Sequence, residues 1–303
     1  MHTVTPSPTG RQITLRRGPV VAQIAQVGAS LRDLEVGGVT IVPPYPLDAP
    51  TPACSGVVLA PWPNRVRDGI WQDGDTTRAL AITEPALRNA SHGLLRFTAY
   101  EIEQDTDATV TLRAQIVPQT GYPYLLDTAV EYALTADGIR VTHTLTNHSA
   151  HPAPVALGTH PFVTIGDVDP RELSLRIPAE TYFETDERLL PIGESPVQGG
   201  VDLRAGRRLG DVTLDTGFAT LHRDTDSRVR TTLTAPDGRA VTVWQGEGFD
   251  YIQAYTTTNY PGQSLALAVE PMTAPAEAFN SGRGLRHLAP GETWTLEWGI
   301  TFD

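Results

Sequence analysis

Short runs of alternating apolar and polar residues, joined by tight turns, recur along the whole chain. The clearest is VEYALTADGIRVTHTLTN, residues 130–147, in which an Asp-Gly pair at 137–138 supplies the turn. On its second arm Ile139, Val141 and Leu145 should share one face with His143, because side chains alternate along a strand. A second hairpin, VRTTLTAPDGRAVTVW, spans residues 229–244 and again has Asp-Gly at its tip. This pattern predicts antiparallel sheets.

The rest of the chain continues the pattern. Further strands are expected over residues 12–16, 19–26, 30–36, 97–104, 109–117, 173–177 and 292–301. Helical periodicity is nearly absent, and only Ala276–Ser281 could form one or two turns. The 27 glycines and 25 prolines are spread evenly rather than gathered in a linker. We therefore predict an all-β fold, a large antiparallel β-sandwich with very little helix, formed by residues 1–303 as a single domain.

Composition limits the partners that the protein can have. A formal net charge of -12 disfavours nucleic acid and an anionic membrane surface, both of which attract basic proteins. No stretch approaches the ~20 apolar residues that a membrane-spanning helix needs. The N-terminal MHTVTPSPTGRQ has no apolar segment, so no secretory signal is expected. Cys54 is the only cysteine, which excludes an intrachain disulfide and suggests a reducing cytoplasm.

The chain contains no lysine, and all 23 of its basic residues are arginines. A lysine Schiff base and a P-loop lysine are therefore both excluded. Any chemistry on a carbonyl compound or a sugar must use carboxylates, histidines, tyrosines or a metal.

Two histidines stand in contexts that suit a function. His160, in ALGTHPF, follows an apolar strand, and Pro161 ends the regular ladder there. His92, in NASHGLLRF, precedes Gly93, and a strand that begins near Leu94 would place it at a cleft rim. A satisfied core histidine and a turn histidine are the alternative interpretations. His143, on the apolar face of its strand, is expected to have a core role.

Three charged residues are further candidates for the site. Glu270 completes the apolar run SLALAV before Pro271, and burying a carboxylate is costly unless it is paired or functional. Asp215, in TLDTGFATL, lies between apolar neighbours, although Asp-Thr-Gly also suits a turn. Arg65, in APWPNRVRDG, follows Trp62 and suits a sugar site or a surface hairpin equally well. No metal-ligand spacing, G-x-S-x-G turn or phosphate loop is present, so neither a metal nor another cofactor is expected.

Five stretches together resemble the aldose 1-epimerase (galactose mutarotase-like) family, in its bacterial branch. They are PNRVRDGIW at 63–71, NASHGLLRF at 89–97, ALGTHPF at 156–162, LDTGFATL at 214–221 and LAVEPMTAPAEAFN at 267–280. They occur in the order that the family shows and span nearly the whole chain. Phe162 departs from the family, since many relatives have tyrosine there.

The resemblance implies a site. The family's catalytic acid corresponds to His160 and its catalytic base to Glu270, while His92, Arg65 and Asp215 correspond to residues that bind the sugar. Asn64 and Gln253 match positions that often line the pocket. Nearby carboxylates are expected to raise the pKa of His160 and keep it protonated.

The resemblance also implies an activity, the interconversion of the α and β anomers of free hexoses by acid–base ring opening and reclosure, without a cofactor. Two alternatives stay open. A sugar-phosphate mutarotase would need arginines beside the site, for which Arg67 and Arg96 are the candidates, and a non-catalytic carbohydrate-binding domain would use the same polar residues only to hold a sugar. A small-molecule sugar is the expected partner, and the sequence does not distinguish a monomer from a homodimer.

Overall fold

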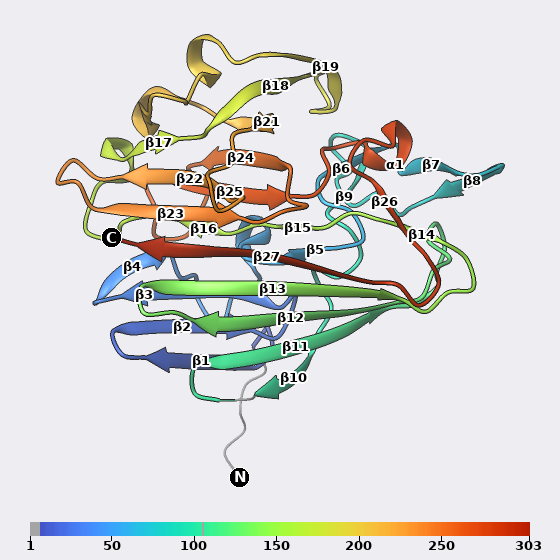
Figure 1. Ribbon diagram of the computed structural model, residues 1–303, viewed down its shortest axis with the longest axis horizontal. Coiled ribbons are helices and arrows are strands. Elements are labelled where there is room, and N and C mark those ends of the chain that lie inside the picture. Colours follow the sequence, from blue (N-terminus) through green and yellow to red (C-terminus); the bar gives the residue numbers. More distant parts are fainter. Residues whose placement is uncertain (1–6, 105) are drawn as a thin grey trace.

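The computed structural model describes residues 7–104 and 106–303 and consists almost entirely of strands (Figure 1). Every strand pairing in this part of the chain is antiparallel. The predicted all-β fold is confirmed. Residues 1–6, the first half of the N-terminal segment in which no secretory signal is expected, lie outside the described residues.

Two large sheets form the body of the molecule. The nine strands of the first are, in spatial order, β10 (Glu101–Gln104), β11 (Thr109–Ile116), β12 (Leu126–Leu134), β13 (Gly138–Asn147), β27 (Thr293–Phe302), β23 (Ala240–Gln245), β22 (Val229–Thr234), β17 (Ser174–Arg176) and β20 (Arg207–Arg208). The second sheet has eight strands. Seven of them are, in spatial order, β19 (Pro191–Pro196), β18 (Ala179–Thr185), β21 (Asp215–Leu221), β24 (Tyr251–Thr257), β25 (Ala266–Met272), β15 (Gly158–Thr159) and β5 (Val58–Leu59), and the eighth, β16 (Phe162–Val163), also pairs with β25.

Smaller sheets complete the architecture. An N-terminal four-stranded sheet contains β1 (Gln12–Arg17), β2 (Val20–Ala25), β3 (Ser30–Val36) and β4 (Val39–Val42). Three two-stranded ribbons pair β14 (Ala153–Val155) with β26 (Arg286–Leu288), β6 (Arg65–Arg67) with β9 (Asn89–Ser91), and β7 (Ile70–Asp73) with β8 (Thr76–Ala79). The short helices are α1 (Ala278–Ser281) and four 3₁₀ turns, Pro52–Cys54, Pro170–Glu172, Gly199–Val201 and Leu209–Asp211.

The alternation in the sequence decides which face of each strand is buried. In β13, Val141, His143 and Leu145 are buried, as the period of two predicts. Leu233 of the nine-stranded sheet and Phe218 and Ile252 of the eight-stranded sheet belong to one cluster of buried apolar side chains. The core therefore lies between the two large sheets, as in a β-sandwich.

One predicted strand is shorter than expected. The segment 97–104 becomes a strand only at Glu101, because residues 94–97 form a turn. Within this turn the N–H of Leu94 donates to the carbonyl of Ala60, and the N–H of Thr98 donates to that of Leu95. Because these backbone N–H groups already have hydrogen-bond partners in the turn and at Ala60, they cannot pair with a neighbouring strand.

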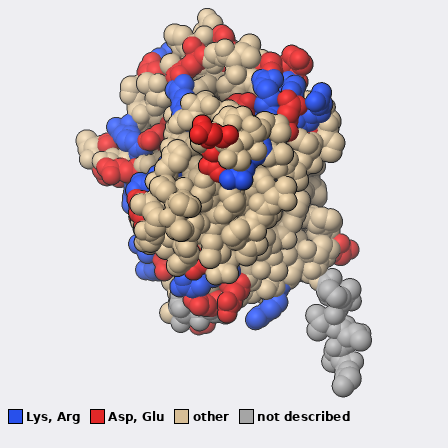
Figure 2. Space-filling model, turned by 90° about the vertical axis from the view of Figure 1, so that its right-hand side faces the viewer, with Lys and Arg blue, Asp and Glu red and all other residues tan. Residues whose placement is uncertain are grey.

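The surface and the helices carry less information. Acidic and basic side chains lie next to one another on the face that Figure 2 shows, and no extended basic area covers it. None of the helices in the described part of the chain has the length and apolar character that crossing a bilayer requires.

Candidate active site

The eight-stranded sheet presents a row of polar side chains on the face turned away from its core. Gln253 of β24 lies directly across from Glu270 of β25, and Tyr255 lies across from Asp215 of β21. Directly paired residues share a face, so all four project to the same side. The amide of Gln253 donates to Asp215 Oδ1 at 2.6 Å, and its carbonyl oxygen accepts from Asn64 Nδ2 at 3.2 Å.

Register brings His160 to Glu270. Gly158 pairs with Met272, and Phe162 pairs with Ala268. His160 lies midway between Gly158 and Phe162, and Glu270 lies midway between Ala268 and Met272, so the two residues face each other. Nε2 of His160 lies 3.3 Å from Oε1 of Glu270. The Phe162 ring stacks on the imidazole of His160, and the two ring centroids are 5.4 Å apart.

Glu270 is buried inside its strand. It is 2% exposed, and β25 continues through Pro271 to Met272, so the carboxylate does not emerge into solvent at a strand end. Its Oε2 atom is buried and has no hydrogen-bond partner among the described residues. A buried acceptor without a partner is costly to the fold unless a ligand or water satisfies it.

Burial shifts the pKa values of this pair in opposite directions. Desolvation raises the pKa of Glu270 well above its usual value, the charge of Asp215 adds to this effect, and Arg65 opposes it. Desolvation lowers the pKa of His160 to about 4. The expectation that carboxylates raise the pKa of His160 is therefore wrong, because burial dominates and the charge of Arg65 lowers the pKa further. With one proton between the two residues, burial favours a protonated Glu270 and a neutral His160.

His92 enters the cavity from a turn rather than from a strand. It directly follows β9 and has a left-handed backbone, with φ 61°, so no strand begins near Leu94. The N–H of Asn64 donates to Nδ1 of His92 at 3.2 Å. This bond assigns the ring proton to Nε2, which remains available as a donor. Burial lowers the pKa of His92, and His160, Arg65 and Arg96 lower it further, so the ring is neutral.

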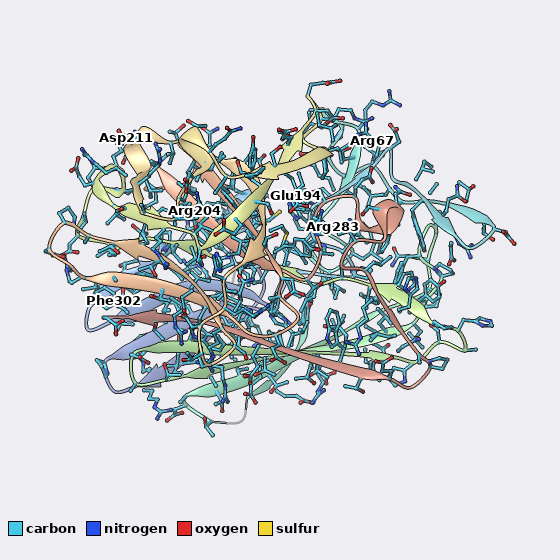
Figure 3. All side chains as sticks on the ribbon, turned by 45° about the horizontal axis from the view of Figure 1, so that its top comes forward. Arg67, Glu194, Arg204, Asp211, Arg283 and Phe302 are labelled. Atoms are coloured by element: carbon cyan, nitrogen blue, oxygen red, sulfur yellow. The ribbon has the colours of Figure 1, made fainter. Side chains whose placement is uncertain are left out.

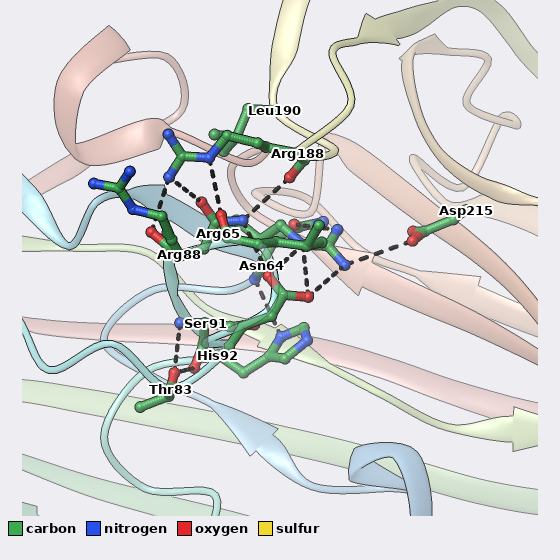
Figure 4. A network of polar contacts seen from close by, with 12 residues as sticks. Asn64, Arg65, Thr83, Arg88, Ser91, His92, Arg188, Leu190 and Asp215 are labelled. Carbon is green, nitrogen blue, oxygen red and sulfur yellow. Dashed lines mark hydrogen bonds and ion pairs between the residues drawn. The ribbon is translucent and has the colours of Figure 1, made fainter.

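Arg65 is held by two carboxylates. Its Nε donates to Glu84 Oε2 at 3.0 Å, its Nη2 donates to Glu84 Oε1 at 3.1 Å, and Nη2 also lies 3.5 Å from Asp215 Oδ2. Figure 4 shows this network, in which a dashed line joins Arg65 of β6 to Asp215. A guanidinium fixed by a bidentate partner keeps one orientation.

The seven predicted site residues meet in one cavity of about 420 Å³. The full lining comprises Ala53, Cys54, Asn64, Arg65, Thr83, Glu84, Ser91, His92, Arg96, His160, Leu189, Asp215, Gln253, Tyr255 and Glu270. No local sequence pattern marks Glu84, Tyr255 or Leu189 as a site residue, although all three line the cavity. Nothing near Glu84 in AITEPAL marks it, since its link to Arg65 exists only in the folded chain. Among the described residues no group of three or more histidines, cysteines or carboxylates could hold a metal.

The β18–β19 hairpin closes one side of the cavity. Its turn carries Leu189, and Arg188 anchors that turn by donating to Asp68 at 3.1 Å and to the carbonyl of Leu87 at 2.9 Å. Two further ion pairs join the hairpin to its surroundings, Asp186 with Arg67 at 2.8 Å and Glu194 with Arg283 at 2.5 Å. Figure 3 shows Glu194 and Arg283 facing each other above the sheet.

His143 lies outside this site. Its Nε2 accepts a hydrogen bond from Nε1 of Trp298 at 2.9 Å in the core, which confirms the predicted core role.

Comparisons with known proteins place the chain. A family model described as Aldose 1-epimerase matches residues 11–301. The chain is 31% identical over 294 residues to "Uncharacterized protein YihR" of Escherichia coli (strain K12), a match that covers 96% of this chain and 93% of that protein.

Solved structures agree on the fold. A galactose mutarotase-like protein from Clostridium acetobutylicum superposes with a TM-score of 0.84 at 19% identity, covering 96% of this chain and 94% of that one. Galactose 1-epimerase from Lactobacillus acidophilus NCFM superposes with a TM-score of 0.81 at 20% identity, with coverage of 96% and 94%. With the family model matching nearly its whole length, this chain belongs to the aldose 1-epimerase family.

Proposed function

We propose that this protein is an aldose 1-epimerase, a mutarotase that interconverts the α and β anomers of free hexoses such as galactose or glucose. The observation that carries the proposal is the buried contact of 3.3 Å between His160 and Glu270 on the wall of a cavity of about 420 Å³. Such a volume is typical of sites for small molecules.

The reaction needs one proton acceptor and one proton donor. Glu270 takes the proton from the hydroxyl on C1 while His160 delivers a proton to the ring oxygen, and the C1–ring oxygen bond breaks to leave an aldehyde and a new hydroxyl. After rotation about C1–C2, the hydroxyl attacks the other face of the aldehyde, and both protons return. No cofactor is required, and each positioned proton transfer typically contributes about 10²–10⁴-fold to the rate.

The reactive pair is a carboxylate and an imidazolium. Burial favours the neutral pair, which contains the same number of protons. The two forms are related by the transfer of one proton across the 3.3 Å contact between Glu270 and His160. The Arg65 cation lowers the pKa of Glu270 and so favours the carboxylate. The hydroxyls of a bound hexose would supply hydrogen-bond partners to Oε2 of Glu270 and Nδ1 of His160, both of which are buried without a partner among the described residues.

The remaining polar residues would orient the sugar. His92 donates from Nε2, Arg65 donates from its guanidinium, and Asp215 accepts from ring hydroxyls. Asn64 and Gln253 extend this set through their hydrogen bonds to each other and to Asp215. Correct orientation alone can supply several kcal/mol of the barrier reduction. We further propose that residues 1–303 act as one domain in the reducing cytoplasm, where the single Cys54 stays a thiol.

The experiment follows freshly dissolved α-D-galactose and α-D-glucose by polarimetry or NMR. We expect the approach to anomeric equilibrium to accelerate in proportion to protein concentration. Saturable binding of both sugars without acceleration would instead identify a carbohydrate-binding domain and contradict the proposal.

A further inference from the structure

Glu84 lies on the wall of the cavity but takes no part in the proton transfers proposed above. Its Oε1 accepts from Nη2 of Arg65 at 3.1 Å and from Nε of Arg65 at 3.3 Å. Its Oε2 accepts from the same Nε at 3.0 Å and from Nδ2 of Asn89 at 3.0 Å. A carboxylate has about four acceptor sites, so little capacity remains for a hydroxyl of the sugar. Glu84 therefore acts on its protein neighbours and not on a ligand.

Asn89 fixes Glu84 from the other side. The N–H of Glu84 donates to the carbonyl of Asn89 at 3.0 Å, and the N–H of Asn89 donates to the carbonyl of Glu84 at 3.2 Å. The Asn89 side chain is buried, donates from Nδ2 to the carbonyl of Arg188 at 3.1 Å and accepts at Oδ1 from Nη2 of Arg188 at 3.3 Å. Backbone and side-chain contacts thus hold the carboxylate in place before a sugar binds.

The other partners of Arg65 restrain it less. Its Nη2 lies 3.5 Å from Oδ2 of Asp215, and its Nη1 donates to Oδ1 of Asn64 at 3.4 Å. Both distances exceed those to Glu84, and both residues belong to the set proposed to orient the sugar. The pair with Glu84 is also shielded from water, since the two side chains are 13% and 26% exposed. An arginine that is not already fixed loses rotamer freedom when it binds a ligand, and this loss lowers the affinity.

We propose that Glu84 is a positioning residue for Arg65, and that it holds the guanidinium in the orientation in which it donates to hydroxyls of the bound sugar. This inference rests on the proposed function and on the role of Arg65 within it. Glu84 contributes to the affinity for the sugar and not to proton transfer, and it acts only through Arg65.

The test measures saturation kinetics with freshly dissolved α-D-galactose by polarimetry, with the spontaneous rate subtracted. Glu84→Gln removes the charge at nearly constant size. We expect KM to increase about 2- to 10-fold, the penalty for ordering one free arginine on binding, and kcat to stay nearly constant. Glu84→Asp retains the charge on a shorter side chain and should raise KM less, about twofold. It decides the test if Glu84→Gln does not fold, which circular dichroism verifies.

Dependence on Arg65 distinguishes positioning from other roles. In a chain that already carries Arg65→Ala, neither Glu84 variant should raise KM further, because the guanidinium that Glu84 orients is absent. A direct contact between Glu84 and the sugar, or a general effect on the fold, would raise KM by the same factor with and without Arg65. Glu103→Gln, which removes the exposed partner of Arg113, is the matched control and should change neither KM nor kcat.

The outcomes separate the two proposals. If the natural chain accelerates mutarotation but the Glu84 variants leave KM unchanged, or raise it equally with and without Arg65, the positioning role is wrong and the mutarotase proposal stands. If the natural chain does not accelerate mutarotation, both are overturned.

Discussion

Nε2 of His160 lies 3.3 Å from Oε1 of Glu270, although the two residues come from segments far apart in the chain. The contact follows from strand pairing. Both β15 and β16 pair with β25, and the break between β15 and β16, which contains His160, lies opposite Glu270 of β25. The contact is therefore set by the register of β25 with the two short strands that flank His160.

Removing either member of this pair should abolish most of the activity. Glu270→Gln and His160→Asn are each expected to lower the mutarotation rate by at least about 10²-fold, because each eliminates one proton transfer. Thermal unfolding should remain cooperative, and His222→Asn, an exposed histidine paired with Glu180, serves as the control. Full activity of Glu270→Gln would show that another carboxylate is the base.

The rate should depend on pH through the single proton that the pair shares. Below about 4, the value to which burial lowers the pKa of His160, a second proton occupies the pair and removes the acceptor. At high pH, above the raised pKa of Glu270, the shared proton is lost and the donor disappears. Initial rates between pH 3 and about 10 should thus form a plateau that declines at both ends, with apparent values that belong to the pair. A rate that rises steadily with pH would contradict a shared proton.

Arg65→Ala should mainly weaken sugar binding. The guanidinium touches Glu84 and Asp215 but not the proposed acid and base, so we expect KM to increase about tenfold or more and kcat to change less. Saturation kinetics with galactose separate the two constants. A loss confined to kcat would instead place Arg65 in the transition state.

Gly93 should be essential for the position of His92. Its φ is +69°, and a Cβ there would lie 2.1 Å from the carbonyl oxygen of Ala60. Gly93→Ala is expected to cost at least about 2 kcal/mol more in unfolding free energy than Gly74→Ala, and to lower activity as well. Gly74 has a similar φ of +59° with open space around it, so it isolates the backbone strain. Equal losses in denaturant titrations of the two variants would contradict the clash.

His143 should make the fold sensitive to acid. Burial lowers its pKa to about 3, whereas the unfolded chain titrates near 6.5. Between these values the unfolded state binds the additional proton, so stability is fully present above pH 6.5 and falls by up to about 1.4 kcal/mol per pH unit as the pH decreases toward 3.

The variant that tests this is His143→Gln, which retains an acceptor for Trp298 but does not titrate. Its unfolding free energy should decrease less steeply with acid than that of the natural chain. His148→Gln, an exposed histidine beside Asp127, is the control and should preserve the original slope. Parallel curves for His143→Gln and the natural chain would rule out His143 as the cause.

The sequence by itself determined the all-β class, the principal hairpins and the buried face of the strand that begins at Gly138. These follow from local chemistry, because a period of two with Asp-Gly turns allows little else. Residues such as Glu270 and His160 could also be singled out, since a carboxylate or an imidazole in an apolar run is costly and therefore conspicuous.

Only the tertiary structure decided how these residues meet. Strand register set the contact between His160 and Glu270, burial reversed the expected pKa shift of His160, and the folded chain brought Glu84 to Arg65. Each depends on segments that are distant in the chain and on desolvation, a property of the packed molecule that no local pattern contains.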